Sequence, residues 1–119
     1  MSDKDIEQEI QAKGKTAPRV TVADIEALIT SAHYFTALEG VWGSMPGFGP
    51  DPILPESLGL LTFCVLVLRN GFTVTGESAC ASPENYDVEL GRKIARQNAI
   101  TKIWQLEGYL LKQRLHDAA

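Results

Sequence analysis

The stretch LLTFCVLVLRNGFTVTGESACASPEN, residues 60–85 of this 119-residue chain, decides the fold. Its first arm is apolar on both faces, whereas its second arm is apolar on only one. Asn70 and Gly71 lie between the two β-rich arms. An Asn-Gly pair there is the strongest short-range signal of a β-hairpin, because a type I′ turn needs positive φ at both central residues. The sequence therefore predicts a β-hairpin closed by a two-residue loop.

The two-residue loop sets the pairing of the hairpin, so that Val67 faces Val74 and Cys64 faces Glu77. One face then carries the larger apolar side chains, and we expect it to be the core face that receives a helix. Its members are Phe63, Val65, Val67, Phe72 and Val74. The other face holds Leu66 and Leu68 opposite threonines of the second arm. These two leucines therefore need a cover that the second arm does not supply.

A two-stranded hairpin is only marginally stable alone, so we expect a neighbour on the far edge of the first arm. The Gly/Pro-rich segment over residues 40–59 is one such neighbour, and a second copy of the chain, through a shared sheet or a helix, is the other. We favour a homo-oligomer, with a dimer as the first choice. The candidate interface residues for an oligomer or another partner are Leu66, Leu68, Trp42 and Phe48.

The N-terminal part divides into a polar segment over residues 1–20, partly mobile, and the start of a single α+β domain over residues 21–119. A short polar helix is expected within residues 3–13, either fraying or docking onto a partner chain. Thr21, with Asp24 three residues later, is typical of a capped helix start. Apolar residues at helical spacing then predict a helix that continues to Gly40.

Residues 40–59 hold five of the ten glycines and four of the six prolines. This composition excludes a long helix or a central strand, although a short third strand is allowed. The segment also carries large apolar residues, including Trp42 and Phe48. We interpret it as a long connection pinned to the core. The alternative is a loop that covers a pocket or a partner surface.

The C-terminal part predicts a long helical segment over residues 83–116, in one piece or two, with Ser82 as N-cap and Pro83 as its first residue. Gly91, Ala95 and Ala99 lie four residues apart and form a seam of small side chains that lets another element approach closely. The fold class is therefore α+β: one or more N-terminal helices, a β-hairpin that allows for a third strand or a sheet shared between subunits, and a long C-terminal helical segment packed on it.

The composition excludes several classes of function. A net charge of −4 and a pI of about 5.1 disfavour general binding to nucleic acids or anionic membranes. No apolar run approaches the roughly 18 residues of a membrane helix, and the charged start MSDKDIEQEI is unlike a signal peptide. Cys64 and Cys80 fit a protein with reduced thiols, and the two cysteines and two histidines lack metal-ligand spacing. We expect no catalytic residues, no metal and no cofactor.

The one dense basic cluster supports a candidate anion site. Arg92 and Arg96 are one helical turn apart, so their guanidinium groups project together and suit a phosphate or carboxylate. The remaining candidate ligands are Lys93, Ser78, Ser82 and Tyr86, near the expected helix start. The plainer interpretation is a solvated helix face with local ion pairs. A reactive thiol is disfavoured, because Glu77 facing Cys64 raises the pKa of that thiol.

Residues 61–111, together with the Tyr34-Phe35 pair, resemble the small tailed-phage proteins grouped around the gene-forty-nine product of coliphage N-four and the gene-sixty-six product of Shigella phage Sf-six. The order and spacing that carry this resemblance are those of Cys64, Asn70, Gly71, Gly76, Ser78, Pro83, Asn85, Gly91, Ala95, Ala99, Trp104 and Gly108. The resemblance implies a phage or prophage gene, expression in the cytoplasm of the infected or lysogenic bacterium, and a small accessory role. It implies no catalytic residues.

Two hypotheses of different classes follow. The first is a non-enzymatic accessory protein that binds a host or phage protein, in host takeover or against host defence, because the chain has surplus apolar surface and lacks a catalytic motif. The alternative is a homo-oligomeric sponge for a small anion or nucleotide signal, because Arg92 and Arg96 lie near a helix start and an oligomer can form pockets between its subunits.

Overall fold

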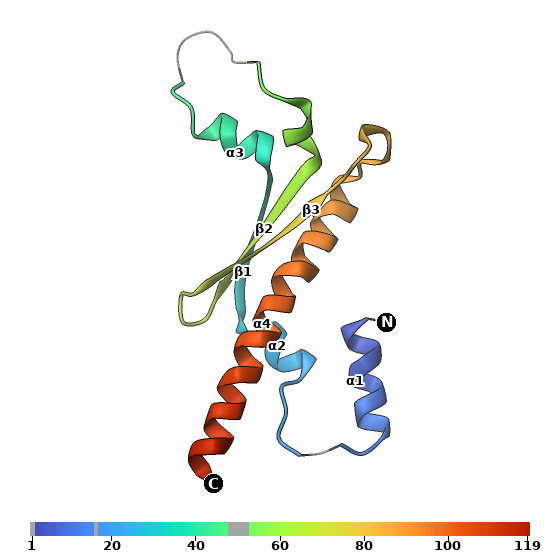
Figure 1. Cartoon of the computed structure of the whole chain (residues 1–119), viewed down its shortest axis with the longest axis vertical. Coiled ribbons are helices and arrows are strands. Elements are labelled where there is room, and N and C mark those ends of the chain that lie inside the picture. The colour runs from blue at the N-terminus through green and yellow to red at the C-terminus, as the bar shows by residue number, and fades with distance from the viewer. Residues whose placement is uncertain (1, 16, 48–52) are drawn as a thin grey trace.

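The computed structural model describes residues 2–15, 17–47 and 53–119. It confirms the α+β class: N-terminal helices, a three-stranded antiparallel sheet and one long C-terminal helix (Figure 1). In chain order the elements are α1 (Asp3–Ala12), α2 (Val22–Leu28), β1 (Ile29–Thr36), α3 (Ala37–Gly43), the 3₁₀ helix η1 (Glu56–Leu60), β2 (Leu61–Leu68), β3 (Thr73–Ala79), the 3₁₀ helix η2 (Pro83–Asn85) and α4 (Val88–Ala118).

The third strand is β1, which pairs with the free edge of β2, so the sheet order is β1-β2-β3. The predicted single helix over residues 21–40 is therefore wrong over residues 29–36, and residues 37–40 belong to a separate helix, α3. Residues 29–36, ITSAHYFT, are rich in β-branched and aromatic side chains. The free edge of β2 also offers backbone N–H and C=O groups that need partners. This pairing overrides the helical spacing of the apolar residues, and the third strand precedes the Gly/Pro-rich segment.

Local capping and a bulge set the ends of β1. The predicted Thr21–Asp24 capping box is present at the start of α2. Thr30 is the extra residue of a β-bulge, and its Oγ1 donates a hydrogen bond of 3.0 Å to the Val67 carbonyl. At the other end Thr36 caps α3, because its Oγ1 accepts from the Glu39 amide while Glu39 accepts from the Thr36 amide.

The hairpin forms as predicted, but its register differs by one residue. Cys64 faces Gly76 instead of Glu77. The Leu68 amide donates to the Phe72 carbonyl at 2.8 Å and the Gly71 amide to the Leu68 carbonyl at 2.9 Å, so the loop holds three residues. Within this loop only Gly71 has positive φ, at 87°, as in a type I turn followed by a left-handed glycine. A one-residue shift in register moves the side chains of β3 to the opposite face relative to those of β2.

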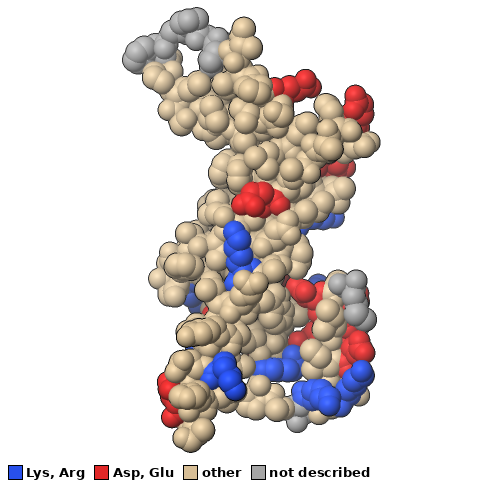
Figure 2. All heavy atoms as spheres, in the orientation of Figure 1, with Lys and Arg blue, Asp and Glu red and all other residues tan. Residues whose placement is uncertain are grey.

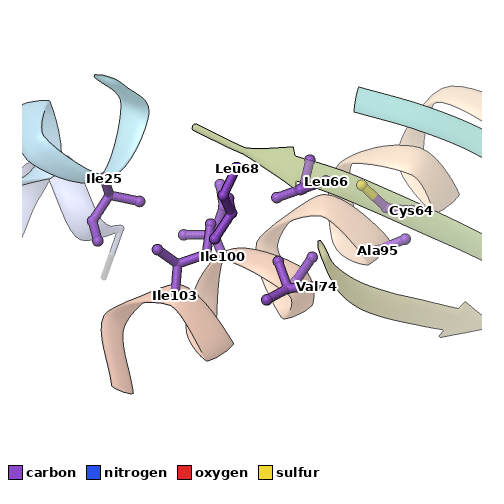
Figure 3. Packing of buried hydrophobic residues seen from close by; sticks show 9 residues of the cluster. Ile25, Cys64, Leu66, Leu68, Val74, Ala95, Ile100 and Ile103 are labelled. Atoms are coloured by element: carbon purple, nitrogen blue, oxygen red, sulfur yellow. The ribbon is translucent and has the colours of Figure 1, made fainter. Parts of the chain in front are cut away.

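The core therefore lies on the face that the predicted register left uncovered. Leu66 is 0% exposed and Leu68 is 7% exposed, and α4 of the same chain covers both (Figure 3). The two leucines do have a cover beyond the second arm, but that cover is α4, and neither the Gly/Pro-rich segment nor a second copy is needed for it. The prediction that the Phe63 face receives the helix is wrong. The core consists of Ile25, Cys64, Leu66, Leu68, Val74, Ala95, Ala99, Ile100 and Ile103.

At Gly76 the backbone of α4 lies directly against the sheet. A Cβ at Gly76 would overlap the Ala95 carbonyl oxygen and the Ala99 amide nitrogen, and would lie 2.9 Å from the Asn98 carbonyl carbon. Farther along the seam, a Cβ at Gly91 would lie 3.1 Å from a side-chain oxygen of β2. The prediction of close packing along the small-residue seam is thus confirmed. Asn98 adds a hydrogen bond of 2.7 Å from its Nδ2 to the Glu77 carbonyl.

The start of α4 differs from the prediction. Pro83–Asn85 forms only a short 3₁₀ turn, and the chain is extended again at Tyr86. The N-cap of α4 is Asp87, whose carboxylate accepts a hydrogen bond of 3.0 Å from the Leu90 amide. A proline and a capping residue can begin either kind of turn, so the motif alone did not locate the long helix. From Val88 the helix continues through Gly108 to Ala118 in one piece.

Helix α1 docks on its own chain through polar contacts. Asp3 accepts hydrogen bonds from Trp104 Nε1 at 3.1 Å and from Gln97 Nε2 at 3.0 Å, both on α4. Glu7 accepts from Arg19 Nη1 at 2.8 Å, which ties α1 to the segment before α2. No residue of α1 is buried. The helix is therefore held mainly by hydrogen bonds and charge.

The molecule is elongated, with extents of 63 × 30 × 18 Å. Its radius of gyration is 18.6 Å, compared with about 13.5 Å for a compact domain of this length. Its accessible surface is 8465 Å², compared with about 6,300 Å² for a compact monomer of this mass. Figure 1 shows α4 continuing past the hairpin turn. The chain thus exposes about 2,100 Å² more than a domain that is closed on itself.

The close approach at Gly76 gives the first prediction. Gly76→Ala should lower the free energy of unfolding by about 3 kcal/mol, because backbone atoms of α4 must move to admit the methyl group. The matched control is Gly108→Ala, where an added Cβ meets no atom within 4 Å and should stabilise the helix by about 1 kcal/mol. Urea denaturation followed by circular dichroism measures both. Equal effects of the two variants would contradict the packing described above.

The Glu7–Arg19 contact gives a prediction on pH. The hydrogen bond from Arg19 lowers the pKa of Glu7 from 4.5 to about 2. The ionised carboxylate therefore stabilises the fold above about pH 4.5, and this contribution disappears as the pH falls toward 2. Glu7→Gln should lower the melting temperature near neutral pH and have progressively less effect in acid. The control is Glu9→Gln, which removes only an exposed pair with Lys13 and should change little at any pH.

Candidate functional site

The sheet face opposite α4 carries an apolar row along its central strand. Phe63, Val65 and Val67 of β2 point to this face and are half-buried. Each lies between residues of the two edge strands in the same register row. The rows are Phe35–Phe63–Glu77, His33–Val65–Thr75 and Ser31–Val67–Thr73. The face is thus apolar in its middle and mostly polar at its edges, and we call these residues the open face.

The open face is exposed to water at both edges. His33 on β1 is exposed, as are Thr73, Thr75 and Glu77 on β3. Phe35 is 37% exposed, and its ring stacks on that of Phe63 with a centroid distance of 5.5 Å. An apolar centre surrounded by a polar rim is the general pattern of a protein–protein contact surface. The open face is therefore the candidate binding site of this chain.

The segment around α3 adds exposed apolar side chains at one end of the sheet. Helix α3 and η1 pack on each other there (Figure 1). Trp42, one of the predicted interface residues, is 51% exposed, and Met45 is also exposed. Phe48, another predicted interface residue, lies outside the described residues. On the face that Figure 2 shows, the region around α3 carries no Lys or Arg, and basic side chains gather toward α1 and the C-terminal half of α4.

The two arginines of the predicted anion site contact groups of their own chain. The Arg92 guanidinium lies 5.6 Å from the centroid of the Tyr34 ring, a cation–π contact. Arg96 Nη2 lies 3.1 Å from Glu26 Oε2 on α2. Lys93, next to Arg92, is exposed. Arg92 and Arg96 thus lie on one side of α4, where they hold β1 and α2 against the helix.

The other predicted anion ligands lie near the start of α4. Ser78 and Tyr86 line a small recess of about 130 Å³, where the Tyr86 hydroxyl lies 3.4 Å from Thr62 Oγ1. The recess is also lined by Asp87 and by no lysine or arginine. Ser82 accepts a hydrogen bond of 3.1 Å from a cysteine thiol through its carbonyl. The predicted ligands therefore fall into separate groups, and the arginines do not line the recess that contains Ser78 and Tyr86.

The environment of Cys64 differs from the predicted one. Cys64 faces Gly76 and Tyr34 in the core, and burial raises the pKa of its thiol. Glu77 lies on the open face beside Phe63 and so is not the cause. Cys80 is half-buried, and both cysteines are free. Across residues 2–15, 17–47 and 53–119, no three His, Cys, Asp or Glu side chains group as a metal site requires.

Sequence reasoning missed the open face because it assigned the same residues to the core. Phe63, Val65 and Val67 alternate with Leu66 and Leu68, and both sets are fully apolar. Only the register against β3 decides which set meets α4. The one available signal was the glycine at position 76, because a glycine inside a strand often marks a close backbone approach. That residue shares a face with Cys64 and Leu66.

The fold is that of a small α+β protein in which one long helix covers one face of the sheet. Residues 20–115 match the model of the Phage protein (N4 Gp49/phage Sf6 gene 66) family, and the chain belongs to this family. The match covers every strand and nearly all of α4, and it leaves out α1. No curated protein and no solved structure matches the chain. None of the described helices is long and apolar enough to cross a bilayer.

The two thiols should differ in reactivity. In the native protein a maleimide should label Cys80 and leave Cys64 unmodified, because Cys64 is fully buried and its pKa is raised. Mass spectrometry of intact protein should show one adduct, and none after Cys80→Ser. Unfolding in urea should restore labelling of Cys64. Rapid native labelling of the Cys80→Ser variant would contradict the placement of Cys64.

Proposed function

We propose that this phage protein is a non-enzymatic accessory protein that binds a protein of the host or of the phage through the open face of its sheet. It acts in the cytoplasm of the infected or lysogenic bacterium, where it redirects a host component or opposes a host defence. The observation that carries the proposal is the apolar row of Phe63, Val65 and Val67, which lies on the face opposite α4.

The composition of the open face supports a protein as its partner. Its apolar row removes water on contact, which is the main favourable term in protein association. The threonines and His33 at its edges supply hydrogen-bonding groups for a polar rim. The face offers one carboxylate, Glu77, and the whole chain carries a net charge of −4. Both features disfavour a nucleic acid and leave an apolar protein surface as the complementary partner.

The alternative, a sponge for a small anion or nucleotide signal, has less support. It relies on Arg92 and Arg96, and these side chains contact Tyr34 and Glu26 in the chain itself. An anion would have to compete with the carboxylate of Glu26 for Arg96. The binding of an anion at these residues therefore stays a prediction.

A capture experiment tests the proposed function. The immobilised chain should retain a specific protein from the lysate of phage-infected cells at physiological salt, and Val65→Glu should abolish this retention. A buried carboxylate in the middle of the contact would lack a partner, which opposes binding. The matched control is Val88→Glu, an exposed position at the start of α4 that should retain the same protein.

Circular dichroism must show that both variants are folded. Retention of no protein by the wild-type chain, or equal retention by Val65→Glu and Val88→Glu, would contradict binding through the open face. Identification of the retained protein by mass spectrometry then decides between a host and a phage partner.

A further inference from the structure

A second apolar surface lies between the hairpin and the C-terminal half of α4. It is a groove of about 650 Å³. One wall is the hairpin, with Phe72 and Val74, and the other is the helix, with Leu106, Tyr109 and Leu110. The groove lies mainly on the α4 side of the sheet, and it meets the open face only at the β3 edge, where Thr73 and Thr75 line both surfaces.

Large apolar side chains in this groove are unusually exposed. Phe72 is 55% exposed, Tyr109 71% and Leu110 44%. Single exposed apolar residues are ordinary, but several on facing walls of one groove mark an interaction surface. Aromatic residues such as Phe72 and Tyr109 are also the kind that anchor protein interfaces.

The groove exists because α4 is longer than the strands it covers. A helix of 31 residues is about 46 Å long, whereas a strand of eight residues spans about 27 Å. Ala95, Ala99 and Ile103 form the stripe of α4 that the sheet buries, and Leu106 and Leu110 continue that stripe at helical spacing. The stripe therefore extends past the sheet, where the chain leaves it exposed.

We propose that a second copy of the chain occupies this groove, in a two-fold symmetric dimer. The turn that holds Tyr109 and Leu110 in each copy packs against the hairpin wall at Phe72 of the other. A two-fold interface uses the same patch on both subunits, and this chain carries both the projecting stripe and the recess that receives it. One arrangement therefore buries the exposed stripe and fills the groove of both copies at once.

The surface area of the chain agrees with a dimer. The chain exposes about 2,100 Å² more surface than a compact monomer. This is more than the roughly 800 Å² that each partner buries in a standard stable interface. The net charge of −4 is small, so repulsion between two copies is weak at physiological salt. The remaining excess leaves room for a different partner on the open face. The dimer would then present two open faces, which strengthens binding to any multivalent partner.

The mass of the protein in solution tests the proposal. Sedimentation velocity and light scattering should give twice the chain mass of 13.0 kDa for the wild type. Leu110→Glu should give the single-chain mass, because the carboxylate would be buried at the interface without a partner. The matched control is Leu90→Glu, on the same helix and 54% exposed, which should remain a dimer. Circular dichroism must show native helix content for both variants.

Cross-linking tests the geometry. A chain with Phe72→Cys mixed with a chain with Tyr109→Cys, both carrying Cys80→Ser, should form a disulfide between the two different chains on mild oxidation. A wild-type chain that stays single at millimolar concentration would overturn the proposal. So would a dimer that Leu110→Glu leaves intact, or one that Val65→Glu dissociates, because the interface would then lie elsewhere.

The two variants distinguish an error in the proposed dimer from an error in the proposed function. Val65→Glu should lose the captured protein and remain a dimer, whereas concentrated Leu110→Glu should be a single chain that still binds the captured protein. Loss of capture alone contradicts the open-face partner, and loss of the dimer alone contradicts the groove.

Discussion

The contact between Gly76 and the backbone of α4 is the constraint on which the rest of the structure depends. The strand has no side chain at this position, so the Ala95–Ala99 turn lies directly on the sheet. This approach brings Cys64 and Leu66 into the core, because they share a face with Gly76. The same contact directs the alternate residues of β2 away from the helix. The position of one glycine thus decides which apolar row is buried and which is exposed.

A three-stranded sheet with a single covering helix cannot bury both of its faces. The open face keeps Phe63, Val65 and Val67 in contact with water, and the length of α4 leaves a second apolar groove beside the hairpin. Both surfaces contribute to the area that the molecule exposes beyond a compact domain of its mass. In the proposed dimer the groove is filled by a second copy, and the open faces remain available for another protein.

Much of the fold was predictable where local chemistry decides it. The hairpin, the capping box at Thr21 and the small-residue seam were all expected and are present. The strand β1 was not expected, because ITSAHYFT also fits helical spacing and only the free edge of β2 makes it a strand. The positions of the candidate site residues were predicted less accurately. Leu66 and Leu68 are core residues, and the apolar row that forms the open face had been assigned to the core.

The sequence by itself determined the class of the fold, the hairpin, the long helix and the family to which the chain belongs, because these depend on turn residues, small-residue spacing and residue order. Tertiary structure alone decided the register, the third strand and the exposed face. An Asn-Gly pair fits a two-residue loop and also a three-residue loop with a left-handed glycine, and the two loops place opposite faces of β2 inward. The close packing of α4 on Gly76 selects between them, and that contact joins residues that are distant in sequence.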